Sequence, residues 1–173
     1  MEIKTYFDKL TEVYRHDFDM ITPVEIGGKK YLGYGHFYGK SARYVLVKRA
    51  TLWTAEAFEH VVFMAGGEDL EADFAEARHL IENHMEENYV RNGNKYPEKD
   101  HMYSFLTVVI LTNLTFGGII REKVNKYKFT KNYMFTVRGY SEGRIIMVNV
   151  ENQDILLSRA AKKMEKFFKT IFS

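Results

Sequence analysis

The chain has 173 residues, of which 46% are hydrophobic and 15% aromatic, enough to fold as a single domain around a sizeable core. It contains no cysteine, and this excludes disulfide bonds, thiolate-bound zinc, cysteine-ligated iron–sulfur clusters and cysteine nucleophiles. The net charge is only +2, the N-terminal segment is interrupted by acids, and no apolar run reaches 18 residues, so we expect a soluble cytoplasmic protein without a membrane span.

The first part of the chain is predicted to contain one amphipathic helix and three strands. The helix covers Glu2–Phe18, where large apolar residues recur at helical spacing within an arc of about 80°. Thr22-Pro23 and Gly27-Gly28 then indicate a loop. The three strands are predicted at Tyr31–Tyr38, Arg43–Trp53 and Glu59–Ala65, with a turn at Gly39-Lys40-Ser41 and a helical turn or loop at Thr54–Phe58.

The clearest helix is predicted at Glu68–Arg91, because an apolar stripe follows helical spacing and acids occupy the first turn. The stripe consists of Leu70, Phe74, Ala77, Ile81 and Met85. Four polar residues fall on the opposite side, namely Glu76, His79, Glu82 and Glu86. We expect these four to point into solvent and therefore predict no metal site, although Glu76-Ala-Arg-His79 has the Glu-x-x-His form of di-iron bundles.

Residues His101–Phe116 form the longest run of apolar and β-branched residues and are predicted to include the central strand of a sheet. Leu106, Val108 and Ile110 alternate with Val109 and Leu111, so both faces of this strand are apolar and need to be covered. A buried helix is the alternative interpretation of such a run.

The C-terminal part begins at Gly117-Gly118, after which a short basic helix is expected to about Lys128. A hairpin is predicted from Tyr133–Arg138 and Arg144–Val150, then a brief strand at Asp154–Leu157. The last helix is predicted at Ser158–Phe172 with Ser158 as its cap. The order αβββαβαβββα predicts an α+β fold, a single-domain mixed sheet of about six strands with helices packed on it.

The turn after the central strand is one candidate site. Unpaired N–H groups at the N-terminus of a helix bind anions, and Gly117 and Gly118 occupy this position. Asn113 and Thr115 share a strand face beside it, and Arg121 lies in the first turn. A plain tight turn is the alternative, because neither G-x-G-x-x-G nor G-K-[ST] is present.

The predicted hairpin from Tyr31 to Trp53 is a second candidate, because it mixes aromatic residues with cations. Single-stranded nucleic acids bind such surfaces by stacking bases on rings and pairing phosphates with cations. His36 and Trp53 on this hairpin, with His101 at the start of the central strand, are the candidate binding residues. The alternative is a sheet with one solvent-exposed face.

The last predicted helix separates its residues into an apolar and a basic face. The basic face, here called the basic surface, consists of Arg159, Lys162, Lys163, Lys166 and Lys169. We expect the apolar face to dock on the sheet and leave the cations exposed, and binding to an anionic membrane is the alternative.

The charges of the chain are unevenly placed. Residues 1–87 carry 10 Lys and Arg against 16 Asp and Glu, a balance of −6, whereas residues 88–173 carry 15 against 7, a balance of +8. Such asymmetry indicates either a surface for an anionic partner or two halves of one fold that attract each other.

These features leave two classes of function open. The first is a binding or interaction module, as a homo-oligomer or with an anionic partner such as nucleic acid or a phosphorylated ligand. The second is a small cofactor-independent enzyme with its site where Asn113, Thr115 and Gly117 meet the aromatic hairpin. A deep pocket with carboxylates of shifted pKa favours the enzyme, and a flat positive face favours binding.

A nuclease-like domain is a variant of the second class, because the predicted order αβββαβ matches the core of restriction-endonuclease-like nucleases. Their site needs an acid and a lysine two residues apart on a strand. Here Arg43–Trp53 contains no acid, and the following strand offers Glu59-His60-Val61. Topology without the site is analogy alone, so we claim no family resemblance from the sequence.

Overall fold

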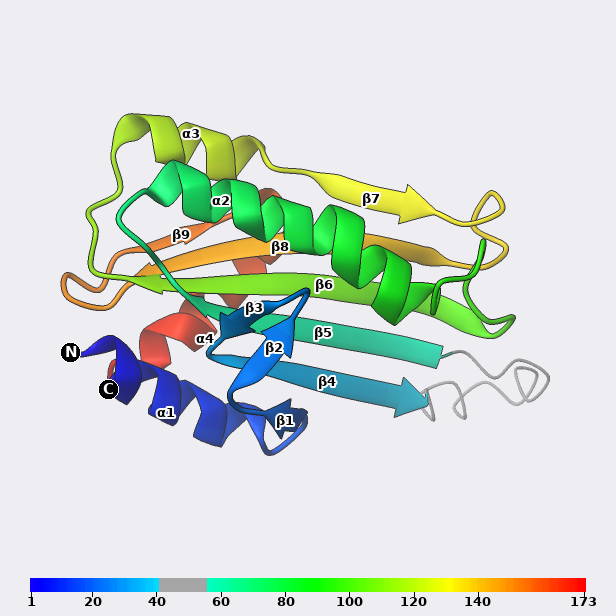
Figure 1. The fold of residues 1–173 in the computed structure, drawn as a ribbon, viewed down its shortest axis with the longest axis horizontal. Coiled ribbons are helices and arrows are strands. Elements are labelled where there is room, and N and C mark those ends of the chain that lie inside the picture. Colours follow the sequence, from blue (N-terminus) through cyan, green and yellow to red (C-terminus); the bar gives the residue numbers. More distant parts are fainter. Residues whose placement is uncertain (41–55) are drawn as a thin grey trace.

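The computed structural model describes residues 1–40 and 56–173 (Figure 1). In this part of the chain the strands form a seven-stranded mixed sheet and a separate two-stranded sheet, which confirms the predicted α+β class. The strands are β1 (Asp19–Ile21), β2 (Val24–Ile26), β3 (Lys29–Tyr31), β4 (Gly33–Lys40), β5 (Glu56–Ala65), β6 (His101–Thr112), β7 (Phe129–Asn132), β8 (Tyr140–Asn149) and β9 (Ile155–Leu157). The helices are α1 (Ile3–Tyr14), α2 (Leu70–His79) with its π-helical continuation η2 (Leu80–Val90), α3 (Gly118–Lys126), the 3-10 helix η3 (Arg159–Met164) and α4 (Glu165–Thr170).

Strand β6 lies in the middle of the large sheet, whose order is β1–β4–β5–β6–β8–β7, with β9 also paired to β8. It runs parallel to both of its neighbours, β5 and β8. Leu106, Val108 and Ile110 belong to the core on one face, and Val109 and Leu111 belong to the core on the other. All five side chains are fully buried, so the predicted central strand with two covered faces is confirmed.

Helices cover the sheet on both faces, giving three layers. One core joins the sheet to α2, η2 and α3, and Figure 1 shows the α2–η2 helix crossing over β6. The other core joins the sheet to α1, η3 and α4. The helices that connect the parallel strands β5, β6 and β8 are α2–η2 and α3, and they all pack on the first face, whereas α1, η3 and α4 from the ends of the chain cover the second.

The C-terminal hairpin differs from the prediction. Its first strand is β7, and residues 133–139 form a turn in which Met134, Phe135 and Thr136 all have positive φ angles. The end of the turn requires glycine at position 139. Gly139 has a φ of 73°, and the Cβ atom of any other residue there would lie 2.1 Å from the carbonyl oxygen of Met102. Close packing against β6 therefore overrides the strand propensity of Tyr133–Arg138.

The long helix differs from an α-helix in its second half, and this changes which side chains are buried. In η2 the wider turn, with hydrogen bonds from residue i to i+5, rotates the following residues relative to the predicted stripe. Glu86, predicted to point into solvent, is only 2% exposed, and Val90 is buried as well. The Glu86 carboxylate accepts hydrogen bonds from Arg91 at 2.7 and 3.0 Å and from the Tyr133 hydroxyl at 2.8 Å, and pairs with Lys131 at 3.0 Å.

Two smaller differences from the prediction concern the start of β5 and the last helix. Strand β5 begins at Glu56, so residues 56–58 are extended and not part of a helical turn. The predicted strand Arg43–Trp53 lies outside the described residues. The last helix is split into η3 and α4. Ser158 occupies the predicted N-cap position, but its hydroxyl makes no capping bond and accepts a hydrogen bond from the Ile145 N–H at 3.0 Å. Among the described residues, the helices are all too short or too polar to cross a membrane.

Candidate ligand-binding site

A pocket of about 340 Å³ lies between β4, β5, the start of β6 and the end of η2. This volume is at the small end of the range for ligand sites. We call it the histidine pocket. It is lined by Tyr34, His36, Phe58, His60, Asn88, Tyr89, Val90, Asn92, Glu98 and His101.

Alternation along two antiparallel strands supplies most of the rings. His36 of β4 lies directly opposite His60 of β5, and Tyr34 and Phe58 follow on the same sheet face two residues away. The His36 and His60 rings are stacked, with centroids 4.7 Å apart and planes 6° from parallel. Phe58 is nearly parallel to His36, at an angle of 5°. The pocket floor is therefore a set of aligned flat rings.

His60 is the most deeply placed polar residue of the pocket, with 4% of its surface exposed. Its Nδ1 forms a hydrogen bond of 2.8 Å with the Tyr34 hydroxyl, and the Tyr89 ring stacks on it with centroids 5.3 Å apart. Its Nε2 has no hydrogen-bond partner among the residues that the structure describes. Burial, together with the nearby His36 and His101, lowers the pKa of His60 to about 3, so this ring is neutral at neutral pH.

His101 is buried and fully bonded. Its Nδ1 lies 2.8 Å from the Arg138 carbonyl oxygen, which only accepts hydrogen bonds, so Nδ1 carries the proton. Its Nε2 then accepts from the Ser104 hydroxyl, also at 2.8 Å. Burial lowers the pKa of His101, although the hydrogen bond with Arg138 opposes that shift. His101 thus shapes the pocket wall and has both nitrogens engaged by protein groups.

The remaining polar groups lie around the pocket opening. Asn88, Asn92 and Glu98 are exposed, and the Asn88 amide donates to the His84 carbonyl oxygen at 2.9 Å. Burial raises the pKa of the Tyr34 and Tyr89 hydroxyls, so both phenols keep their protons. The pocket therefore combines aromatic and imidazole rings inside with one acidic side chain and two amides at its edge.

The structure separates the residues proposed from the sequence into two groups. His36 and His101 line the histidine pocket, and Trp53 lies outside the described residues. Thr115, Gly117 and Gly118 line another cavity beyond the opposite end of β6, and Asn113 follows the end of that strand. His101 is the first residue of β6, whereas Asn113, Thr115 and Gly117 follow its last, so these candidate residues do not line one cavity in the described part of the chain.

The cavity at Gly117 and Gly118 contains acids that the sequence argument did not place there. Glu68, Asp69 and Glu71 line it together with the start of α3. Arg121, the cation expected to attract an anion, forms an ion pair with Asp154 and donates to the Phe116 carbonyl oxygen at 3.2 Å. These carboxylates oppose the binding of an anion at this turn.

Residues 2–170 match the family model described as Domain of unknown function (DUF8052). The chain belongs to this family. No curated protein and no solved structure matches it.

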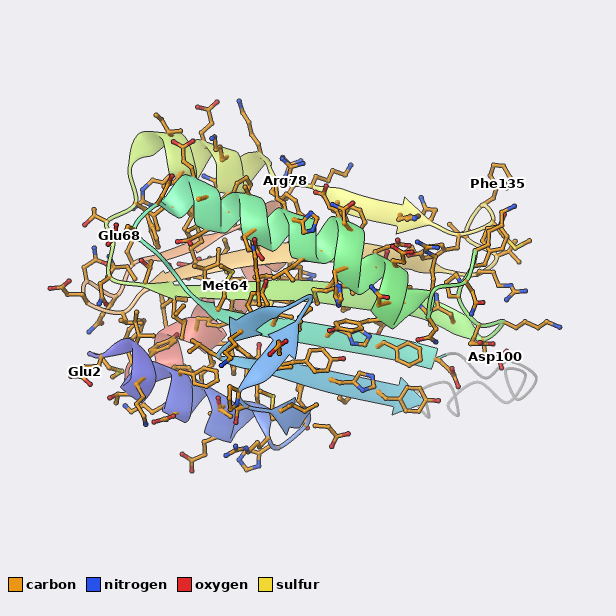
Figure 2. All side chains as sticks on the ribbon, in the orientation of Figure 1. Glu2, Met64, Glu68, Arg78, Asp100 and Phe135 are labelled. Carbon is orange, nitrogen blue, oxygen red and sulfur yellow. The ribbon has the colours of Figure 1, made fainter. Side chains whose placement is uncertain are left out.

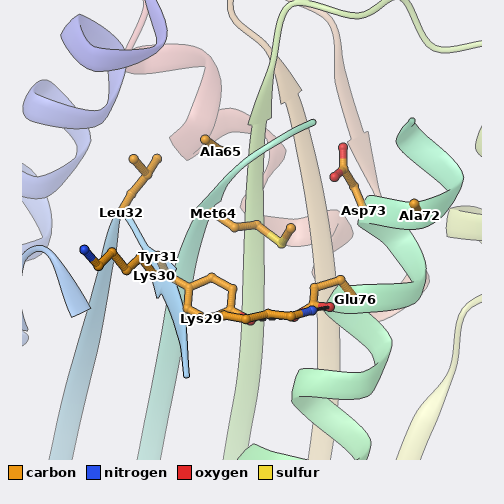
Figure 3. Close-up of a pocket in the computed structure, with 9 residues that line it drawn as sticks. All are labelled: Lys29, Lys30, Tyr31, Leu32, Met64, Ala65, Ala72, Asp73 and Glu76. Atoms are coloured by element: carbon orange, nitrogen blue, oxygen red, sulfur yellow. Dashed lines mark hydrogen bonds and ion pairs between the residues drawn. The ribbon is translucent and has the colours of Figure 1, made fainter. Parts of the chain in front are cut away.

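A further cavity, of about 490 Å³, separates β3 and the end of β5 from α2 (Figure 3). Its polar groups bind one another. Glu76 accepts hydrogen bonds from Lys29 and from the Tyr31 hydroxyl, both at 2.5 Å, and Asp73 accepts from the Gly67 N–H at 3.0 Å. The bonds to Glu76 attach the β2–β3 hairpin to α2, and none of the residues that line this cavity has a buried polar side-chain atom without a partner among the described residues.

In residues 1–40 and 56–173, no group of three or more acids and histidines is arranged to hold a metal ion.

The five cations of the basic surface are all exposed. Beneath them Ala161, Phe168 and Ile171 are buried in the core shared with the sheet, so the predicted docking of the apolar face is confirmed.

Sequence reasoning missed His60, Tyr34 and Tyr89 as pocket residues. One signal was available, since Tyr34-x-His36 and Phe58-x-His60 each place two rings on one face of a strand. No sequence pattern indicates the register that pairs His36 with His60. Nor does any pattern indicate the π-helix that contains Tyr89.

Proposed function

We propose that this protein is a small-molecule-binding domain, and that the histidine pocket holds a planar heteroaromatic ring without negative charge. The observation that carries the proposal is His60, a residue of the pocket whose buried Nε2 has no hydrogen-bond partner among the described residues. A buried polar atom without a partner costs about 1–3 kcal/mol. A ligand that bonds to this nitrogen would remove that cost.

The shape and charge of the pocket support this class of ligand. The pocket is lined mainly by aromatic and imidazole rings, which favour a flat aromatic molecule, because stacking on aromatic side chains contributes roughly 1–3 kcal/mol per ring. A neutral His60 offers one hydrogen bond at Nε2, which suits a ring nitrogen or N–H. Asn88 and Asn92 can pair with groups on the ring edge, and the Glu98 carboxylate disfavours an anion.

Binding is better supported than acid–base catalysis. A general base works best with a pKa near the operating pH, whereas the pKa of His60 is about 3. His101 is bonded to protein at both ring nitrogens and has no nitrogen left to accept a substrate proton. These two facts argue against acid–base catalysis by His60 or His101 in this pocket.

Calorimetric titration with adenine and with guanine as probes tests the proposal. We expect the wild-type protein to bind at least one of them and His60→Phe, which keeps the flat ring but lacks Nε2, to bind about tenfold more weakly or worse. Tyr89→Leu removes a stacking ring and should weaken binding by a similar factor. His79→Gln is the matched control, because His79 is an exposed histidine outside the pocket.

Absence of binding by both probes would overturn the ligand class. Equal affinity of wild type, His60→Phe and Tyr89→Leu would overturn the site. Cyclohexylamine, a non-aromatic ring, should not bind, and binding of it as tight as that of adenine would contradict the role of stacking.

We propose the basic surface as a second candidate function, the recognition of nucleic acid. Its support is the exposure of all five cations on η3 and α4. Affinity for a single-stranded oligonucleotide should fall steeply with salt, and joint charge reversal at Lys162 and Lys166 should flatten that slope. If the affinity for the oligonucleotide changes neither with salt nor on charge reversal at Lys162 and Lys166, this candidate function is rejected.

A further inference from the structure

Ring side chains gather over β4 and β5 next to the end of η2 (Figure 2), and Tyr34 and His60 are two of them. The Tyr34 hydroxyl lies 2.8 Å from the His60 Nδ1 and has no other hydrogen-bond partner among the described residues. A neutral imidazole has one N–H and one nitrogen with a lone pair, so this bond can run in either direction. Its direction decides whether the buried Nε2 of His60 is a donor or an acceptor.

A count of donors and acceptors favours Tyr34 as the donor. If the phenol donates to the His60 Nδ1, its proton and the lone pair of Nδ1 are both used, and only the Nε2–H is left over. If Nδ1 donates to the phenol oxygen instead, the Tyr34 O–H has no acceptor among the described residues, and the lone pair of Nε2 is unused as well. Polar groups inside proteins are hydrogen-bonded in the great majority of cases, so the arrangement with fewer unused groups is preferred.

The acid–base chemistry of the two groups favours the same direction. A phenol O–H is a good donor and its oxygen a weak acceptor, whereas a bare imidazole nitrogen is a good acceptor, with an ordinary pKa of about 6.5 for its protonated form. Burial raises the pKa of Tyr34, so the phenol keeps the proton that it donates. Because the pKa of His60 is about 3, the ring is neutral and has a single N–H. That N–H is therefore on Nε2.

His101 in the same pocket has the opposite arrangement. The Arg138 carbonyl oxygen can only accept, so it holds the proton on the His101 Nδ1, and the Nε2 accepts from Ser104. At His60 the partner of Nδ1 is a donor, and the proton stays on Nε2. His101 thus leaves no ring nitrogen unused, whereas His60 leaves one N–H without an acceptor among the described residues.

We infer that Tyr34 fixes the proton of His60 on Nε2 and that the histidine pocket therefore selects planar ligands with a hydrogen-bond acceptor in the ring plane. The inference rests on the proposed function, because it names which heteroaromatic ligands that pocket accepts. A ring nitrogen with a lone pair accepts from the Nε2–H, whereas a ring that offers only an N–H sets two donors against each other. A buried site built for one hydrogen-bond partner discriminates against a ligand that lacks it. Tyr34 is thus a specificity-determining residue that acts through His60.

Two measurements test this inference. Nitrogen-15 NMR of the ligand-free protein reports the tautomer, because the ring proton couples to the nitrogen that carries it, and His60→Phe assigns the signals by their loss. Calorimetric titration then compares quinoline, whose ring nitrogen is an acceptor, with indole, a bicyclic ring of similar size whose only polar group is an N–H. Tyr34→Phe keeps the ring but removes the donor to Nδ1. Tyr96→Phe is the matched control, because Tyr96 is a tyrosine outside the pocket and is 38% exposed.

We expect the proton on Nε2 in the ligand-free wild type, and quinoline to bind at least about tenfold more tightly than indole. In Tyr34→Phe the bare Nδ1 can take the proton, so the ratio of the two affinities should fall by at least about threefold. In Tyr96→Phe the ratio should equal that of wild type.

A proton on Nδ1 of the ligand-free wild type would overturn the inference, as would indole that binds as tightly as quinoline. Both outcomes leave the proposed function intact, because a planar ring can still bind in the pocket. Failure of both rings to bind, with the proton found on Nε2, would overturn the proposed function and the selection of ligands together, while the assigned tautomer stands.

Discussion

Replacement of Glu86 by glutamine tests how the buried carboxylate stabilises the end of the sheet. Glu86 pairs with Arg91 at the end of η2 and joins η2 to the β7–β8 hairpin through Lys131 and Tyr133. The substitution keeps the size of the side chain but removes its charge. Two cations then lose their common partner.

The expected loss is about 2–3 kcal/mol in the free energy of unfolding. Removal of one member of a buried pair costs roughly 3–5 kcal/mol when the other charge stays buried. Here Arg91 is 17% exposed and Lys131 is 44% exposed, so both cations regain some water and the loss falls below that range.

The same substitution should change the acid dependence of stability. Burial alone would raise the pKa of Glu86, but the hydrogen bonds from Arg91, Lys131 and Tyr133 hold it below its ordinary value of 4.5. Its stabilisation is therefore complete above about pH 4.5 and is lost as the pH falls through the folded-state pKa. Glu86→Gln should lack this part of the acid loss.

Urea unfolding followed by circular dichroism, at several values between about pH 3 and pH 7, measures both effects. Glu82→Gln is the control, since Glu82 forms a more exposed pair with Arg78 and should change stability by less than about 1 kcal/mol. A Glu86→Gln variant within about 0.5 kcal/mol of wild type at pH 7, or one with the wild-type acid profile, would refute the assigned role.

Three further predictions concern the core, the turn and the pocket. Ile110→Ala should cost roughly 2–5 kcal/mol because the side chain is fully buried, and a loss under about 0.5 kcal/mol in urea unfolding would contradict the central position of β6. Gly139→Ala should cost at least about 2 kcal/mol, since the new methyl group would meet the Met102 carbonyl, whereas Gly117→Ala, with open space around it, should stay within about 1 kcal/mol in the same assay. Because the folded pKa of His60 lies near 3 and below the ordinary 6.5, its contribution to stability falls as the pH drops from 6.5 toward 3, by up to about 1.4 kcal/mol per pH unit. His60→Phe should remove that slope in unfolding curves measured across this range, and an unchanged slope would count against a buried neutral His60.

Sequence patterns predicted the parts of the fold that depend on local periodicity. The alternation of Val108 and Ile110 with Val109 and Leu111 was enough to place β6 between two layers, because a two-fold period assigns each side chain to a face. The amphipathic last segment likewise docked with its cations exposed.

The errors arose where distant contacts decide local structure. Glu86 was assigned to solvent because an α-helical rotation was assumed through a segment that is π-helical. A strand was predicted at Tyr133–Arg138 from residue propensity. These residues form a turn instead, because Tyr133 is buried and Gly139 approaches β6 closely. The charge asymmetry is satisfied in part within the fold, since Lys123 pairs with Glu71 and Arg144 with Glu59 across the two halves.

The sequence predicted only some of the residues that line the histidine pocket. His36 and His101 were selected for their residue types, and both line the pocket. His60 gained its importance from the strand register and from burial that leaves one nitrogen unpaired, neither of which a single sequence records.

Nitrogen-15 NMR of the histidine rings, recorded with and without adenine, tests the central claim most directly. If the pocket binds this planar ring, the His60 Nε2 resonance should shift strongly on titration, with smaller changes at His36 and none at the exposed His79. A titration in which adenine binds while the His60 Nε2 resonance stays in place would contradict the claim that this nitrogen is the ligand's partner.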